Sequence, residues 1–269
     1  LVKTNLGEFN CIAIKNIVVG DFVQLEIIQD SKKPLGKITK VNKRSSVLSR
    51  RDGNKNKLFA ANVTHVGILV TPNPKTTTEF IDKWILKTKL SNIEPFILNN
   101  KIDVESDQEY INKIKIYRDI NFNIINISAK YDENLDELIS FIKNKCVLFV
   151  GNSGAGKSTL TSKIIGKELK TNELSNDQGV HTTSISSLYE LTDNAKVIDS
   201  PGMRDIELLD YSRENIINGF EEIFELSKNC KFNDCNHINN QGCKVIEGLA
   251  NGVISKSRYN NFIKFRDSI

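Results

Sequence analysis

One glycine-rich segment constrains the fold of this chain more than any other feature. It reads Gly151-Asn152-Ser153-Gly154-Ala155-Gly156-Lys157-Ser158, matches G-x-x-x-x-G-K-[ST], and directly follows the apolar run Val147–Val150. Such a segment needs a buried strand before it and a helix after it, because its N–H groups turn inward around phosphates and the helix N-terminus adds positive charge. We therefore expect an α/β domain with a nucleotide-phosphate site. Lys157 would reach the terminal phosphates, the Ser158 hydroxyl would bind Mg²⁺, and the expected contacts extend from Gly151 to Thr159.

Apolar runs that alternate with helical patterns extend this fold through the middle of the chain. Helical spacing appears at Phe80–Thr88, after Ser106, where Glu109 completes a capping box, and at Leu135–Ile142. Strands alternating with such helices predict a mostly parallel sheet. The runs typical of buried parallel strands are Val66–Val70, Pro95–Leu98, Ile124–Ile127, Val147–Val150 and Val197–Ile198.

Two polar loops after successive predicted strands indicate which base the site reads. Asn100-Lys101-Ile102-Asp103 follows the first of them. A carboxylate such as Asp103 can accept from both N1–H and the exocyclic amine of guanine, a pairing that adenine lacks, so a wrong base would leave it unpaired. Asn100 would support the purine, and the Lys101 stem would lie against it. The second loop, Ser128-Ala129-Lys130, resembles one that backs guanine with main-chain amides. We expect GTP and GDP as ligands.

A third loop and the segment before it supply candidate switch residues. Asp199-Ser200-Pro201-Gly202 has the Asp-x-x-Gly form, in which the Asp holds Mg²⁺ through water and the Gly amide senses the γ-phosphate. Upstream, His181-Thr182-Thr183 suits a loop whose Thr closes on Mg²⁺; we prefer Thr182 and leave Thr183 open. His181 has two interpretations, an approach to the γ-phosphate or an RNA partner, and a role only in loop shape.

The residue after Gly202 predicts slow hydrolysis. Many GTPases place a water-orienting Gln there, whereas this chain has Met203, which cannot orient water through a hydrogen bond. We expect unassisted turnover of roughly 10⁻⁴ s⁻¹, the scale of a GTPase without its activator. An activating partner is therefore part of the prediction.

The order of these segments is unusual. Asn100–Asp103 and Ser128–Lys130 precede the phosphate loop, whereas GTPases usually place the phosphate loop first. A parallel sheet tolerates this relocation, because its termini can be rejoined at exposed ends while each strand keeps its neighbours. The order predicts a circularly permuted G domain in which movement at Gly202 passes to the C-terminal segment.

The C-terminal segment carries a compact set of metal-ligand residues: Cys230, Cys235, His237 and Cys243. Three thiolates and one imidazole form a closed tetrahedral set for structural Zn²⁺. Disulfides suit a reducing compartment less well.

Positive charge is concentrated at the N-terminus. Residues 1–64 hold 12 Lys and Arg against 5 Asp and Glu, while the whole chain has a net charge of only +4. Short β-branched runs between turn signals predict a small antiparallel barrel there, and the charge suits a polyanion. Solvated strand faces are the alternative reading of the charge. The sequence contains no run of 18 apolar residues, so we expect no membrane span and a cytoplasmic protein.

Together these segments resemble one family closely, the bacterial circularly permuted small-subunit-dependent GTPases of the RsgA/YjeQ family. The resemblance covers nearly the whole chain and implies an OB-type barrel at 1–64, a permuted α/β P-loop GTPase domain at 65–209 and a helical zinc-binding domain at 210–269. It further implies a monomer that binds the small (30S) ribosomal subunit and 16S rRNA late in maturation, is stimulated to hydrolyse GTP, and then leaves. The N-terminus is short for this pattern, so a barrel strand or basic extension is expected to be missing.

The expected reaction is attack of water in line on the γ-phosphoryl group, with Ser158 and Thr182 on Mg²⁺ and with Lys157 stabilising the charge. Two other interpretations stay open. The first is an RNA chaperone or scaffold that GTP switches and in which hydrolysis is incidental. The second is an ATP-binding or kinase-like protein in which Asn100–Asp103 is a simple turn.

Overall fold

The structure, a computed structural model, describes residues 1–28, 34–52, 55–171, 187–199, 206 and 211–268. The predictions for His181, Thr182, Thr183 and Gly202 lie outside these residues. The chain divides into two compact units, Leu1–Val63 and Thr64–Ile269, and each is described by itself. The division into three domains stays a prediction.

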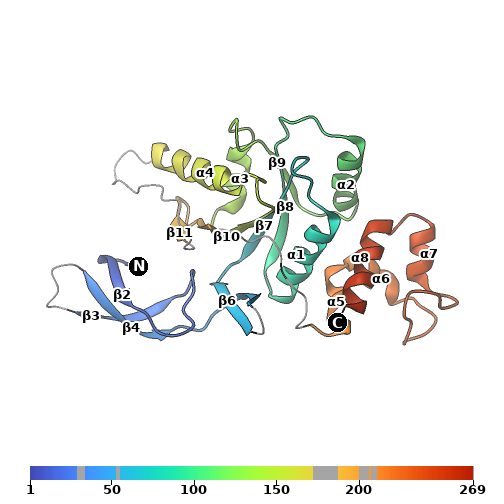
Figure 1. The fold of residues 1–269 in the computed structure, drawn as a ribbon, viewed down its shortest axis with the longest axis horizontal. Coiled ribbons are helices and arrows are strands. Elements are labelled where there is room, and N and C mark those ends of the chain that lie inside the picture. Colours follow the sequence, from blue (N-terminus) through green and yellow to red (C-terminus); the bar gives the residue numbers. More distant parts are fainter. Residues whose placement is uncertain (29–33, 53–54, 172–186, 200–205, 207–210, 269) are drawn as a thin grey trace. The chain divides into compact units, whose positions relative to one another are not determined.

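The N-terminal unit is built from a curled four-stranded sheet and a separate hairpin (Figure 1). Its core is small: Phe9, Ile38, Leu48 and Ala60 are buried. The sheet contains β1 (Val2–Thr4), β2 (Gly7–Ile12), β4 (Leu35–Val41) and β3 (Val23–Ile28) in that order, and the hairpin pairs β5 (Val47–Asp52) with β6 (Lys55–Ala61).

One pairing in this unit differs from the antiparallel pattern that we expected. Strands β2 and β4 pair in parallel, with Asn10 opposite Leu35, whereas β3 and β4 are antiparallel. The reason is that the chain reverses once between β2 and β3 and again between β3 and β4, so β4 runs in the direction of β2. A curled sheet of this kind neither shows nor contradicts the OB type.

The second unit is centred on a six-stranded sheet, and every strand predicted for it is present. Strand β11 is antiparallel to β12, and the other neighbours are parallel. The strands in spatial order are β11 (Ser187–Glu190), β12 (Lys196–Asp199), β10 (Cys146–Val150), β7 (His65–Val70), β8 (Glu94–Asn100) and β9 (Ile124–Ile127).

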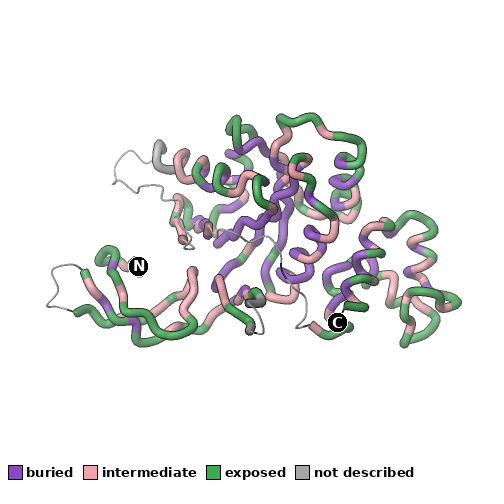
Figure 2. The backbone as a smooth tube through the Cα atoms, in the orientation of Figure 1, coloured by how far each residue is buried: buried purple, intermediate pink, exposed green. Residues whose placement is uncertain are grey.

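Helices cover both faces of this sheet. On one face, Leu138 of α3 and Leu160 of α4 share a buried cluster with strand residues such as Phe149. Helices α1 and α2 lie on the opposite side (Figure 1), and the buried strands between the layers form the core (Figure 2). The helices are α1 (Thr78–Leu90), α2 (Gln108–Asp119), α3 (Leu135–Ile142) and α4 (Lys157–Thr171). The predicted α/β class is confirmed.

Helix α2 begins one residue later than its capping box suggests. Its N-cap is Asp107, not Ser106, and the Asp107 carboxylate accepts a hydrogen bond from the Tyr110 N–H at 2.8 Å. A negatively charged acceptor at this position is also stabilised by the positive end of the helix dipole, which explains why Asp107 is the N-cap.

The C-terminal helices pack against α1, which itself lies on the sheet. Phe220, Ile223, Val245 and Phe262 form a buried cluster that includes Leu86 of α1. The elements are α5 (Arg213–Ile216), the 3₁₀ turn η1 (Ile217–Gly219), α6 (Glu221–Ser227), α7 (Lys244–Ala250) and α8 (Lys256–Asp267). Among the described residues, no helix has the length and apolar character needed to span a membrane.

Candidate functional site

The candidate site lies at one edge of the parallel sheet. Strands β8, β9, β10 and β12 run in the same direction, so their carboxyl ends meet at this edge. Asn100 ends β8, Ser128 follows β9, Gly151 follows β10, and Asp199 ends β12. The fold therefore brings the predicted base loops, the phosphate loop and the Asp-x-x-Gly aspartate to one edge, although they are far apart in the sequence.

The Asn100 side chain ties three of these segments together. It is 1% exposed. Its Nδ2 donates to the Ala155 carbonyl in the phosphate loop at 2.8 Å, and its Oδ1 accepts from the Ala129 N–H at 3.0 Å. A buried amide with both ends satisfied is rigid, because losing either partner would leave an unpaired polar atom. Asn100 thus fixes the distance between the base loops and the phosphate loop.

The other residues of the first base loop are held from different sides. The Asp103 carboxylate is exposed and accepts from the Ser128 hydroxyl at 2.5 Å. Lys101 has a φ of +67° and donates from Nζ to the Asn73 carbonyl at 2.7 Å. These contacts join Asp103 to the second base loop and turn the Lys101 stem toward the loop before α1.

The phosphate loop has the backbone that its glycines allow. Gly154 and Gly156 have φ values of +77° and +97°, a region that favours glycine. Lys157 Nζ donates to the carbonyls of Gly151 at 2.5 Å and Asn152 at 2.9 Å. Burial raises the pKa of Asp199, and the nearby Lys157 charge partly offsets that rise. The phosphate loop and β12 thus place an ammonium and a carboxylate near each other at the sheet edge.

The remaining predicted contacts differ in exposure. Ala129 and Ala155 are buried, whereas Lys130, Ser153, Ser158 and Thr159 are exposed. The exposed groups leave the outer side of the phosphate loop open to a ligand.

Sequence reasoning missed the residues that support the first base loop. Tyr110 of α2 donates to the Val70 carbonyl and to Asn99 Oδ1, and Asn99 Nδ2 donates to Asn126 Oδ1 at 2.8 Å. Asn73, the acceptor for Lys101, was also missed. Only the position of Asn99 beside the base motif was a signal in the sequence, because the other contacts depend on how α1 and α2 pack.

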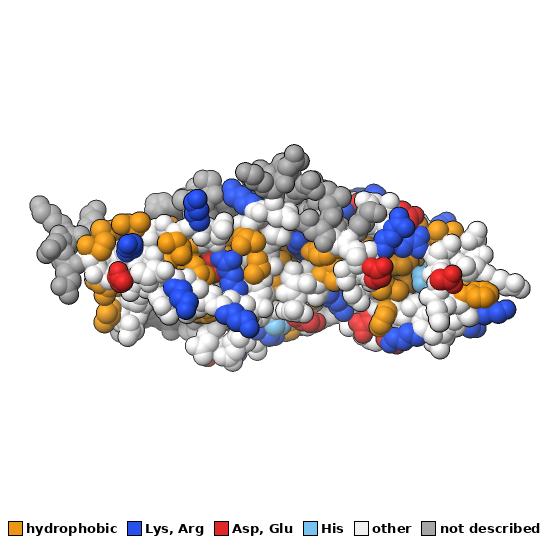
Figure 3. Space-filling model, turned by 90° about the horizontal axis from the view of Figure 1, so that it is seen from below, with side chains coloured by type: hydrophobic (Ala, Val, Ile, Leu, Met, Phe, Trp, Pro, Cys, Tyr) orange, Lys and Arg blue, Asp and Glu red, His pale blue; other side chains and the backbone are white. Residues whose placement is uncertain are grey.

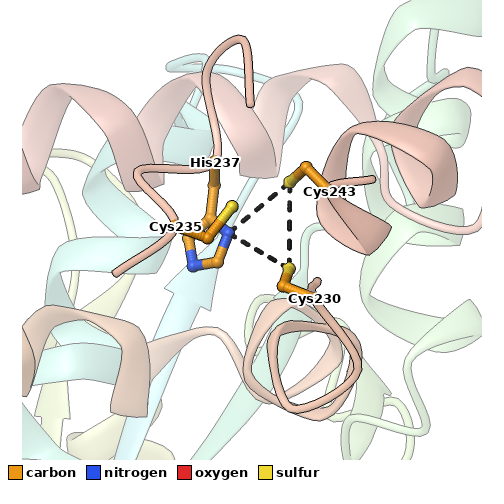
Figure 4. Close-up of side chains that lie close together, drawn as sticks. All are labelled: Cys230, Cys235, His237 and Cys243. Carbon is orange, nitrogen blue, oxygen red and sulfur yellow. Dashed lines mark hydrogen bonds between the residues drawn. The ribbon is translucent and has the colours of Figure 1, made fainter. Parts of the chain in front are cut away.

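The four predicted metal ligands come together in the C-terminal segment (Figure 4). One ligand atom from each of Cys230, Cys235, His237 and Cys243 lies within 4.8 Å of all the others, so the group could hold a metal ion. The His237 ring directs Nδ1 toward the cluster, 3.7 Å from Cys230 Sγ and 3.6 Å from Cys243 Sγ. The Tyr259 hydroxyl donates to the His237 carbonyl at 2.7 Å and fixes this turn.

The surroundings of Cys230 lower the pKa of its thiol, whereas burial raises the pKa of Cys235 to about 11. Burial by itself would raise the pKa of the Cys230 thiol, but the N–H groups of Lys244 and Val245 and the neighbouring thiols hold it below its ordinary value. A thiolate is the form that binds metals.

Comparison with known proteins gives consistent matches over most of the chain. Residues 41–209 match the family model described as RsgA GTPase. A relative from Flavobacterium psychrophilum named "Small ribosomal subunit biogenesis GTPase RsgA" is 35% identical over 96% of this chain and 83% of its own length. A relative of the same name from Haemophilus influenzae is 33% identical over 95% of this chain and 76% of its own length.

Solved structures agree with these matches. The crystal structure of YjeQ from Thermotoga maritima superposes with a TM-score of 0.74 at 29% identity and covers 98% of this chain and 91% of that one. The structure of YloQ, a circularly permuted GTPase, gives a TM-score of 0.71 at 24% identity, covers 97% of this chain and 86% of that one, and supports the fold alone.

Proposed function

The chain belongs to the RsgA GTPase family, and from this we propose that it hydrolyses GTP during biogenesis of the small ribosomal subunit. The observation that carries the proposal is the Asn100 amide, which joins the two base loops to the phosphate loop at one sheet edge. An ATP-binding protein would not need Asp103 tied to the second base loop. Relatives named as small-subunit biogenesis GTPases supply the biological context.

We assign the guanine base to the two base loops. Asp103 accepts from the base, and Ser128 holds the carboxylate in place for it. Asn100 keeps the phosphate loop at the right distance, and the Lys101 stem and the Ser128–Lys130 backbone border the ring. The phosphate contacts extend from Gly151 to Thr159, with Lys157 leaving the loop carbonyls to meet the terminal phosphates.

The residues at the sheet edge also fit a magnesium ion. The exposed Ser158 hydroxyl and the Asp199 carboxylate are oxygen donors, which Mg²⁺ prefers, and Thr182 is assigned as a further ligand. When bound, Mg²⁺ would neutralise charge on the β- and γ-phosphates. Lys157 adds positive charge on the other side, and Gly202 senses the γ-phosphate. Because Met203 stands where many GTPases have a water-orienting Gln, we assign the acceleration of hydrolysis to a partner.

We propose that the Cys/His cluster holds one structural zinc ion. A tetrahedron with Zn–S of about 2.3 Å and Zn–N of about 2.0–2.1 Å has S···S edges of about 3.8 Å and N···S edges of about 3.6 Å. The Cys230 and Cys243 sulfurs are 3.9 Å apart, and His237 Nδ1 lies 3.7 and 3.6 Å from them. These three distances fit zinc, and Cys235, whose ligand atom lies within 4.8 Å of the other three, is assigned as the fourth ligand.

The N-terminal unit is assigned to 16S rRNA. Lys and Arg side chains lie among apolar ones on the face over its strands, with few acidic groups (Figure 3). Exposed Lys37, Lys40, Lys43, Arg50 and Lys57 belong to the basic stretch that the sequence singled out. The working form is a cytoplasmic monomer that binds the small subunit and leaves after hydrolysis.

GTP turnover with and without purified small subunits, at low and high salt, tests the proposal. We expect subunits to stimulate turnover and salt to weaken that stimulation, because phosphate contacts depend on counterion release. Binding to subunits without any change in single-turnover hydrolysis would favour a GTP-switched scaffold. Equal competition by ATP and GTP would refute the guanine assignment.

A further inference from the structure

A buried charge network joins the C-terminal helices to α1. Asp82 of α1 is 0% exposed and accepts from Arg258 of α8 at 2.7 Å. The Asp82 carboxylate also accepts hydrogen bonds from Asn261 of α8 at 2.6 Å and from Tyr117 of α2 at 2.8 Å. On its other side, Arg258 donates to both carboxylate oxygens of Glu222 in α6, at 2.7 and 2.9 Å. One guanidinium therefore holds α1, α6 and α8 in a single arrangement.

This network fixes the position of α1 more strictly than apolar packing would. A buried carboxylate and a buried guanidinium are stable only while their hydrogen bonds are made. A small shift of α8 along α1 would break these bonds and therefore raise the free energy of the folded chain. Beside the network, a Cβ at Gly219 would lie 2.8 Å from Leu86 Cβ, so the 3₁₀ turn η1 also approaches α1 closely. The C-terminal helices thus set the orientation of α1.

The loop that precedes α1 contacts the candidate nucleotide site. The preceding loop supplies the Asn73 carbonyl that accepts from Lys101 at 2.7 Å. In the same loop, Pro74 Cδ lies 3.6 Å from the place where a Cβ of Gly154 would be. One short loop between β7 and α1 therefore touches both the base motif and the phosphate loop, and α1 continues from its C-terminal end.

We propose that Arg258 is a positioning residue for guanine-nucleotide binding. By fixing α1 through Asp82, it keeps the Asn73–Pro74 turn against Lys101 and the phosphate loop. The inference rests on the proposed function of those loops. Because coupling free energies are reciprocal, bound nucleotide strengthens the docking of α8 on α1 by the same factor that Arg258 contributes to nucleotide affinity. This route is separate from the Asp-x-x-Gly switch predicted from the sequence.

The test is titration of a fluorescent GDP analogue into the full chain and its Arg258→Gln variant, each also in a Lys101→Ala background. We expect Arg258→Gln to weaken GDP binding by about 5-fold or more. In the Lys101→Ala background the same change should have a smaller effect, because the Lys101 contact, one of the two that this turn makes with the site, is already absent. A residue with only a general structural role would give the same factor in both backgrounds.

The matched control is Lys264→Ala. Lys264 pairs with Glu79 at 2.7 Å and joins the same two helices, but its side chain is 61% exposed, so GDP affinity should stay within about 2-fold. Amide hydrogen exchange gives the reciprocal measurement, since GDP should protect α8 in the wild-type chain and not in Arg258→Gln. Circular dichroism and zinc content establish that each variant is folded.

Three results would overturn the inference. The first is wild-type GDP affinity in a folded Arg258→Gln chain, and the second is an equal loss in both backgrounds. If Arg258→Gln does not fold, Asn261→Ala, which removes one hydrogen bond from Asp82 and leaves the charges paired, replaces it in the same comparison. The third is a wild-type chain that binds no GDP, which would refute the proposed function itself.

Discussion

Replacing Gly156 by alanine should damage the nucleotide site through a single methyl group. The residue has a φ of +97°, and a Cβ there would lie 2.6 Å from Asn100 Nδ2. An L-residue in this region costs about 1–2 kcal/mol. The displaced Asn100 amide would also weaken its hydrogen bonds to Ala155 and Ala129, each a net contribution of about 1 kcal/mol. We expect a loss of about 3 kcal/mol in the free energy of unfolding.

Urea unfolding followed by tryptophan fluorescence measures this loss, because Trp84 is the single tryptophan of the chain and is fully buried in α1. Gly166→Ala is the matched control. Gly166 lies inside α4 with no heavy atom within 4 Å of an added Cβ, so the same substitution should stabilise the protein by roughly 0.5–1 kcal/mol. The reasoning fails if Gly156→Ala stays within about 1 kcal/mol of the wild type while Gly166→Ala behaves as expected.

Three further outcomes are expected. Asp103→Asn should weaken GTP binding by about 100-fold and shift preference toward xanthosine triphosphate, because the amide cannot accept from both guanine donors; competition titration measures this, and unchanged GTP affinity would contradict the base assignment. Metal analysis should find about one zinc per chain, and chelation should unfold the segment around Cys230 and Cys243; a chain purified without zinc would contradict the cluster. Burial, reinforced by Lys145, lowers the pKa of His65 from 6.5 to about 4. The unfolded chain therefore gains a proton that the folded chain does not, so stability falls from pH 7 to pH 5, and His65→Gln should remove about 1 kcal/mol of that loss after allowance for its partial exposure. Unfolding midpoints at the two pH values check it, and equal losses in both proteins would show that His65 is not responsible.

Local patterns in the sequence predicted the strands, the family and the Cys/His cluster. Each buried strand is a short apolar run. The runs ending at Leu98, Ile127 and Val150 are followed by motifs in which each residue type predicts a particular contact with a nucleotide. The Cys/His cluster was predicted for the same reason, since Cys230, Cys235, His237 and Cys243 are close in sequence as well as in space.

Contacts between distant segments were not predictable in the same way. Asp82 stands within an apolar helical run, a hint that something charged meets it, but nothing local identifies Arg258, 176 residues away. The Asn73 carbonyl offers no signal at all, because any residue has a backbone carbonyl. The parallel pairing of β2 with β4 likewise depends on how two chain reversals combine rather than on either strand.

The pairing of β7 with β10 in the middle of the sheet affects how the chain folds during its synthesis. Strand β7 pairs with β10, and at their start the Thr64 hydroxyl donates to the Cys146 carbonyl, 82 residues further along. During synthesis, β7, β8 and β9 leave the ribosome together with both base loops before β10, the strand that completes their sheet on the other side. Such a late, long-range pairing slows acquisition of the native state. The emerging chain must shield a half-covered hydrophobic surface until β10 and α4 arrive.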